Sequence, residues 1–164
     1  MTFATLAEIK KELQQADADL LQTLCLRLAK YKKENKELFG YLLFESQNEP
    51  SYVRQIKEDI DLQFEDLKDR NLYIVKKMLR KILRYTNRHI KYSTNDETDL
   101  ELRIYFCEKV KAAKIPLATS ATLFNLYQGQ LKKINAIVTK LPEDLQSDYE
   151  KAITSISKFG SSEV

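Results

Sequence analysis

Apolar side chains return at every third or fourth position along most of this chain. The pattern is clearest between residues 51 and 69, where the apolar positions are Val53, Ile56, Ile60, Phe64 and Leu67. Because an α-helix has about 3.6 residues per turn, side chains at this spacing share one helical face. Only three glycines and three prolines interrupt the 164 residues, too few for the turns that a many-stranded sheet needs every ~8–12 residues. The chain is therefore expected to be all-α.

Residues that commonly cap the start of a helix precede several of these apolar stripes. Thr5, with Glu8 three positions later, forms a capping-box sequence, in which each side chain satisfies a backbone amide at the start of a helix. Ser51, Thr98 and Ser120 precede other apolar stripes and are expected to act as N-caps. These signals predict about eight helices, packed as an irregular helical bundle or a short HEAT-like stack.

The longest unit of the fold is expected to be a helical hairpin over residues 51–92. No shift in composition divides the chain, and the longest expected linker is the polar loop before Asp99,. A single domain is therefore predicted over residues 1–158, followed by a disordered tail at residues 159–164.

Two features of the sequence are expected to lie inside the fold. Residues 37–46 are apolar on nearly every side of a helix, which predicts a central segment, and Gly40 within it would permit a close helix contact,. Cys25 and Cys107 both fall within apolar helical patterns without a second ligand at metal-binding spacing,. Both are predicted to be buried, reduced thiols.

The net charge and the hydropathy of the chain bear on its expected location and partners. The net charge of +3 is too small by itself to indicate a nucleic-acid or membrane partner. The first fifteen residues lack the apolar core of a secretory signal, and no apolar run approaches the ~20 residues of a membrane span,. A cytoplasmic location without a membrane partner is expected.

Signals of an enzyme are few. His89, the only histidine, falls on the apolar side of its helix beside Ile82 and Tyr85, where a packed, hydrogen-bonded histidine is favoured over a catalytic one. Thr86 stands where a helical di-iron site would need glutamate,. The sequence also lacks a phosphate-binding loop, a serine-nucleophile elbow and a zinc-ligand set. No catalytic residue, metal or cofactor is therefore predicted.

One side of the helix expected over residues 71–92 is strongly basic. No Asp or Glu occurs between Arg70 and Asn95. At 100° per residue, the cations of this segment fall within an arc of about 140°. We call them the basic face: Arg70, Lys76, Lys77, Arg80, Lys81, Arg84, Arg88 and Lys91. A stripe of this kind can follow a phosphate backbone.

Pairing within the hairpin is the alternative interpretation of these charges. Two helices joined by a short turn tend to pack antiparallel, so acids of the preceding helix would lie against the basic face. Each exposed pair would contribute only ~0.2–1 kcal/mol and would indicate no function. For all of these acids except Glu58, a solvated face is favoured over a divalent-cation site. These acids are Glu58, Asp59, Asp61, Glu65, Asp66 and Asp69.

Three stretches of the chain carry a likeness to known sequences. They are LQTLCLRLAKYKKENKELFGYLLFE from Leu21, LYIVKKMLRKILRYTNRHIKY from Leu72 and LRIYFCEKV from Leu102. Over most of its length the chain resembles a family of small helical bacterial proteins of unknown function. The resemblance implies a helical fold and a bacterial source, and it transfers no functional residues.

Two classes of function follow from these observations. The leading prediction is a non-enzymatic protein-interaction or scaffold module, because helical surface is abundant and catalytic constellations are missing. The alternative is binding of nucleic acid or another polyanion through the basic face, with Lys77, Lys81, Arg84 and Arg88 as its site. The expected partner is therefore a protein or, second, a nucleic acid.

Overall fold

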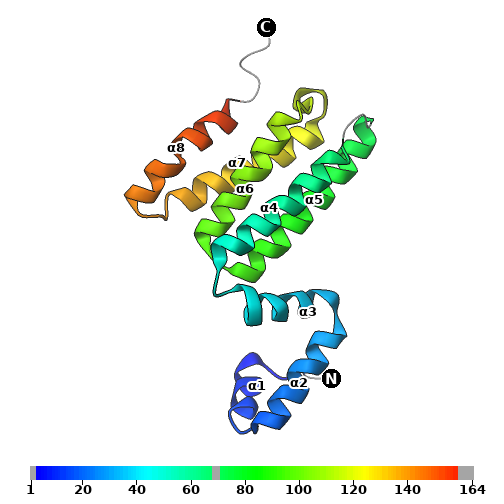
Figure 1. Ribbon diagram of the computed structural model, residues 1–164, viewed down its shortest axis with the longest axis vertical. Helices are drawn as coiled ribbons and strands as arrows, with labels where there is room; N and C mark the ends of the chain where they lie inside the picture. The colour runs from blue at the N-terminus through cyan, green and yellow to red at the C-terminus, as the bar shows by residue number, and fades with distance from the viewer. Residues whose placement is uncertain (1–2, 68–70, 159–164) are drawn as a thin grey trace. The chain divides into compact units, whose positions relative to one another are not determined.

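The chain folds into α-helices, as the apolar spacing predicts. The structure, a computed structural model, describes residues 3–67 and 71–158. Across these residues it contains eight α-helices, one π-helical turn, one 3-10 turn and no strand (Figure 1). The α-helices are α1 (Leu6–Leu13), α2 (Ala18–Tyr31), α3 (Lys33–Gly40), α4 (Glu49–Glu65), α5 (Leu72–Ser93), α6 (Asp96–Ala112), α7 (Ala121–Val138) and α8 (Glu143–Ser157). The prediction of an all-α bundle of about eight helices is confirmed.

The chain divides into two compact units. Unit 1 comprises Met1–Glu45 and unit 2 comprises Ser46–Val164. The single domain predicted over residues 1–158 stays a prediction, and the tail predicted at residues 159–164 lies outside the described residues.

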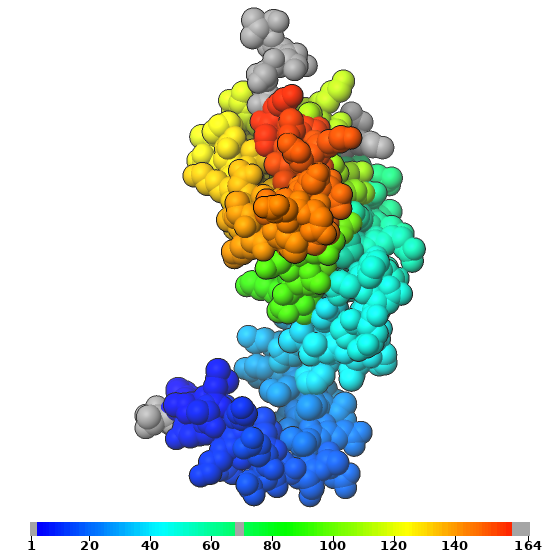
Figure 2. Space-filling view, turned by 90° about the vertical axis from the view of Figure 1, so that its left-hand side faces the viewer, coloured from blue at the N-terminus to red at the C-terminus, as the bar shows by residue number. Residues whose placement is uncertain are grey.

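Unit 2 is built around α6. Helices α4, α5 and α6 pack against one another, and α6 also packs against α7 and α8 (Figure 1). The space-filling view shows α8, in orange, on the surface of unit 2 beside α7, in yellow (Figure 2). All four helices that contact α6 contribute to the core. The fully buried apolar side chains include Ile60, Leu79, Leu100, Leu102, Phe106, Ile134 and Ile156.

Unit 1 lacks a comparable core. Among residues 3–45, the only buried side chain is that of Tyr41, which opens the π-helical turn Tyr41–Glu45. The prediction of a central segment at residues 37–46 is therefore wrong: Leu43 is 66% exposed and Phe44 is 76% exposed. Nothing lies within 4 Å of a Cβ built on Gly40, so this glycine makes no close helix contact.

The two cysteines differ in burial. Cys107 lies in the core of unit 2, as predicted, whereas Cys25 on α2 is exposed. The prediction for Cys25 is wrong because an apolar helical stripe shows which side chains would pack together. It does not show whether another element covers them.

Side-chain caps begin most of the helices. Thr5 and Glu8 form the predicted capping box, and Ser120 caps α7. The other two predicted caps are wrong, because Asn48 caps α4 and Asn95 caps α6. Asparagine also accepts from backbone amides, so in both cases a suitable residue three positions earlier starts the helix.

The residue predicted to cap α6 has a different role. Thr98 is buried and donates a hydrogen bond to Glu49 Oε1 at 2.8 Å. Ser93, at the end of α5, donates to the same oxygen. These two hydrogen bonds connect the first turn of α4 to the end of α5 and the first turn of α6. Within the described part of the chain, no helix combines the length and the apolar character needed to cross a membrane.

Candidate polyanion-binding face

Helix α5 exposes the basic face because its opposite side is buried. Asn71 caps the helix by accepting from the Ile74 amide, and the 22-residue helix spans about 33 Å. Its buried residues recur at helical spacing and pack toward α4 and α6. They are Val75, Leu79, Ile82, Thr86 and Ile90, followed by Tyr92 and Ser93 at the end of the helix.

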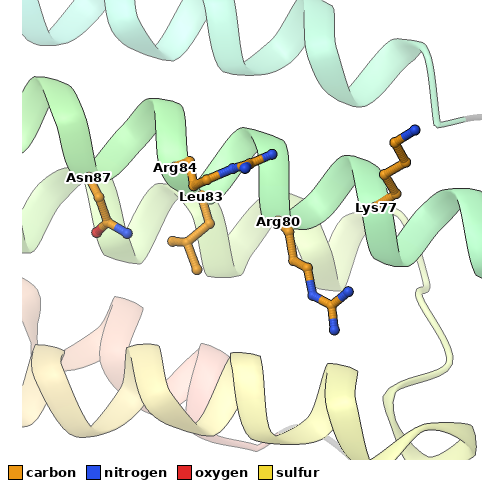
Figure 3. Close-up of a pocket in the computed structure, with 5 residues that line it drawn as sticks. All are labelled: Lys77, Arg80, Leu83, Arg84 and Asn87. Carbon is orange, nitrogen blue, oxygen red and sulfur yellow. The ribbon is translucent and has the colours of Figure 1, made fainter. Parts of the chain in front are cut away.

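A shallow pocket lies along α5. Its volume is about 340 Å³, and its lining residues are Lys77, Arg80, Leu83, Arg84 and Asn87. In Figure 3 the side chains of Arg80, Leu83 and Asn87 extend from α5 toward α7, while Arg84 lies along the helix. Lys77 extends from the other side of α5. We call these five residues the basic pocket, which combines three cations with one amide and one apolar side chain.

The four predicted site residues do not have equivalent positions. Lys77 and Arg84 are exposed and line the basic pocket, whereas Lys81 is exposed but outside its lining. Arg88 is half-buried, and its guanidinium lies 5.9 Å from the centre of the Tyr85 ring. Arg80 joins Lys77 and Arg84 in the pocket although it was not among the four, and Arg70 lies outside the described residues.

Asp61 of α4 interacts with α6 and not with the basic face. Asp61 lies 2.8 Å from Lys109 Nζ and accepts a hydrogen bond from Tyr105 at 2.6 Å, both from α6. Burial raises the pKa of Asp61, but the Lys109 and Tyr105 hydrogen bonds together outweigh this effect and lower it,. Asp61 therefore remains ionised and paired with α6.

Asp59 of α4 contacts α5 in the middle of the two helices, but its partner there is uncharged. It accepts a hydrogen bond from the Tyr85 hydroxyl. Burial, followed by this bond to Asp59, raises the pKa of Tyr85 and keeps it protonated as the donor,.

Three cations of the basic face are left without an ion pair to the described acids of α4. Among the described residues, no ion pair joins an acid of α4 to Lys77, Lys81 or Arg84. The interpretation that α4 neutralises these three residues is wrong, because the inward faces of the two helices meet through apolar residues and Tyr85. Asp69, one of the six acids, lies outside the described residues.

A buried polar cluster next to the pocket was not predicted. Arg103 of α6 is 6% exposed and donates from Nη1 to Asn87 at 3.0 Å and to Gln130 of α7 at 2.7 Å. Its Nε lies 2.5 Å from Asp99 Oδ1. Asn87 belongs both to this cluster and to the basic pocket, so Arg103 holds one wall of the pocket in place.

His89 forms part of an aromatic group. Its Nδ1 lies 2.7 Å from the Tyr52 hydroxyl oxygen, and its ring centre lies 4.4 Å from that of Tyr85 and 5.5 Å from that of Tyr92. The histidine is half-buried. The prediction of a packed, hydrogen-bonded histidine is confirmed in its contacts.

Comparisons with known proteins add no assignment. No protein-family model, curated protein or solved structure matches this chain. The resemblance to a family of small helical bacterial proteins stays a prediction.

Proposed function

We propose that this protein binds a polyanion, with a nucleic-acid backbone as the main candidate, through the basic face of α5. One observation carries the proposal. Lys77, Arg80 and Arg84 line one exposed pocket, and no described carboxylate forms an ion pair with them. Three adjacent cations without an internal counter-charge attract phosphate groups strongly.

The length of the basic face suits a chain of phosphates. Lys77 and Arg88 are eleven residues apart, which corresponds to about 16 Å along the helix. One strand of duplex DNA rises about 3.4 Å per phosphate, so roughly five phosphates fit along this span. Tyr73, which is 77% exposed near the start of the same face, offers a ring on which an unpaired base can stack.

The salt dependence of binding tests this proposal. If about five phosphates are neutralised, the logarithm of the affinity should fall with the logarithm of salt concentration at a slope near −4. Fluorescence anisotropy of a short labelled DNA, single-stranded or duplex, measures this slope. Binding that does not respond to salt would contradict the proposal.

Charge reversal locates the binding surface. Replacing Lys77, Arg80 and Arg84 by Glu should weaken binding by about 100-fold or more and reduce the slope to about −1, because three phosphate contacts are lost. The matched control replaces three exposed lysines elsewhere in unit 2, Lys140, Lys151 and Lys158, by Glu. It makes the same change in net charge and should retain most of the affinity. Equal losses in both variants would show that net charge alone is responsible.

Protein interaction is the second candidate function. It is favoured by unit 1, where α1, α2 and α3 contain no buried residue although their apolar side chains recur at helical spacing. Exposed apolar surface of this extent is characteristic of docking sites. This surface includes none of the residues of the basic face, so the two functions can be tested separately.

A further inference from the structure

We propose that the apolar side of unit 1 binds a second copy of this chain, with the two α2 helices packed antiparallel. The proposal rests on protein interaction as the second candidate function and specifies its partner. It is independent of polyanion binding by α5.

The first argument is the amount of exposed apolar surface. Unit 1 holds twelve of the fifteen large hydrophobic side chains that are exposed in the described chain. Leu26 faces away from the other apolar side chains of α2, and partial burial of the remaining eleven would remove roughly 400–900 Å² of surface from water, which is comparable to the ~800 Å² per partner of a standard interface. The twelve are Phe3, Leu6, Ile9, Leu13, Leu20, Leu24, Leu26, Leu28, Tyr31, Leu42, Leu43 and Phe44.

The second argument concerns what could cover this surface. In the described part of unit 2, only Leu62, Tyr73 and Phe124 are large exposed hydrophobics, and they lie on three different helices. Over residues 46–67 and 71–158, unit 2 therefore offers no exposed apolar face of matching size. A second copy of unit 1 offers an identical one, as the self-complementary interface of a two-fold dimer requires.

The third argument is charge. Unit 1 contains seven Lys or Arg and seven Asp or Glu, so two copies do not repel each other through net charge. The charges are separated along α2, since Asp17 and Asp19 lie at its start whereas Lys30 and Lys32 lie at its end. Parallel packing would place like charges together, but antiparallel packing brings opposite charges into register.

The register follows from matching these charges. If the helices cross between Leu24 and Cys25, Asp17 of one copy lies level with Lys32 of the other on the side that faces it, whereas Asp19 and Lys30 lie on the outer side of α2. At 100° per residue, the apolar arc of α2 is then centred near Leu28. Leu26 lies on the opposite side of the helix, outside the interface. The two Cys25 residues come close together at one edge of the contact.

The mass of the full chain in solution tests the proposal. Light scattering after size exclusion should give twice the chain mass of 19.2 kDa at high concentration and a concentration-dependent decrease on dilution.

Leu28→Asp should raise the dimer dissociation constant by about 100-fold or more, because each dimer would then bury two unpaired carboxylates. Leu26→Asp is the matched control. Leu26 is 53% exposed and Leu28 is 55% exposed on the same helix, so both substitutions should affect the stability of α2 similarly. A difference in dissociation constant between the variants therefore shows which side of α2 forms the interface.

A double-mutant cycle tests the antiparallel register. Asp17→Asn, which keeps a side chain able to cap α2,, and Lys32→Gln should each weaken association about 3-fold to 10-fold at low salt. The double variant should weaken it no further than either single variant, because each single change already removes the charge pair. Additive losses would overturn the antiparallel register.

Crosslinking provides a readout independent of mass. Helices in contact lie 8–10 Å apart, so a short bismaleimide should join two chains through Cys25 and should give no dimer with Cys25→Ser. Cys107 is buried and cannot substitute for it.

A strictly monomeric chain at all concentrations, or equal effects of Leu28→Asp and Leu26→Asp, would overturn the proposal. Either result leaves the salt dependence of DNA binding unaffected, so the two proposals fail separately.

Discussion

Replacing Arg103 by methionine is expected to lower the free energy of unfolding by about 3–5 kcal/mol, because removing one partner of a buried ion pair leaves the other uncompensated. The Arg103 side chain is 7% exposed and that of Asp99 is 22% exposed. Methionine approximates the volume of the aliphatic part but donates no hydrogen bond. Asp99 would lose its cation, while Asn87 and Gln130 would lose the donor that Arg103 supplies.

Urea denaturation followed by circular dichroism measures this loss. The control is Lys109→Met, which removes the cation from an ion pair with Asp61 in which the side chains are 30% and 40% exposed. Solvent screens such a pair, so the control should cost less than about 1 kcal/mol. If Arg103→Met cost no more than Lys109→Met, the buried cluster would not stabilise the fold.

The thiol of Cys107 is expected to react at least about 1,000-fold more slowly in the folded chain than in the unfolded one, because the thiolate is the reactive form. Burial raises the pKa of Cys107 to about 12, and the opposing effect of Arg103 is smaller,. Each pKa unit reduces the thiolate fraction tenfold at neutral pH. The absence of solvent contact at this residue reduces the rate further.

A chromogenic disulfide reagent at pH 8, applied to the Cys25→Ser variant with and without urea, measures the reactivity of Cys107 alone. The same shift has a consequence for stability. Because the folded chain holds the thiol proton more tightly than the unfolded chain, this group contributes to stability at neutral pH. The contribution is lost as the pH rises from about 9 toward 12,. Rapid labelling without urea would show that the core around α6 opens readily.

The sequence was sufficient to predict the helices and most of the core of unit 2. Ile56, Ile60 and Phe64 belong to the stripe that defined the pattern, and all three are buried. The prediction succeeds because a helix that buries one side needs apolar residues every third or fourth position. The misplaced caps show the limit, since Asn48 and Ser51 both suit a helix start and only the surrounding packing selects between them,.

The arrangement of polar groups could not be predicted in the same way. Arg103 is a charged residue within a helical pattern, and its burial depends on Asn87 and Gln130, which are distant in sequence. The pairing of Asp61 with Lys109, instead of with α5, likewise depends on where α6 lies. Local spacing contains no information about such long-range contacts, so the basic face could be identified from the sequence, but the absence of ion pairs between Lys77, Lys81 or Arg84 and the described acids could not.

In unit 1, the apolar spacing predicts helices correctly but does not predict burial. Its leucines follow the same spacing as those of unit 2, yet Leu24 and Leu28 remain exposed. An apolar stripe predicts that a surface will be covered and leaves open whether the cover belongs to the same chain.

The central position of α6 limits which amino-acid substitutions the chain can accept during evolution. Leu100, Leu102 and Phe106 have no solvent contact, and four other helices pack against this one. Substitutions along α6 must therefore suit several neighbours at once, whereas those on the outer side of α5 need suit only the solvent or a ligand. New binding properties can accordingly arise on α5 without compromising the interior that α6 organises.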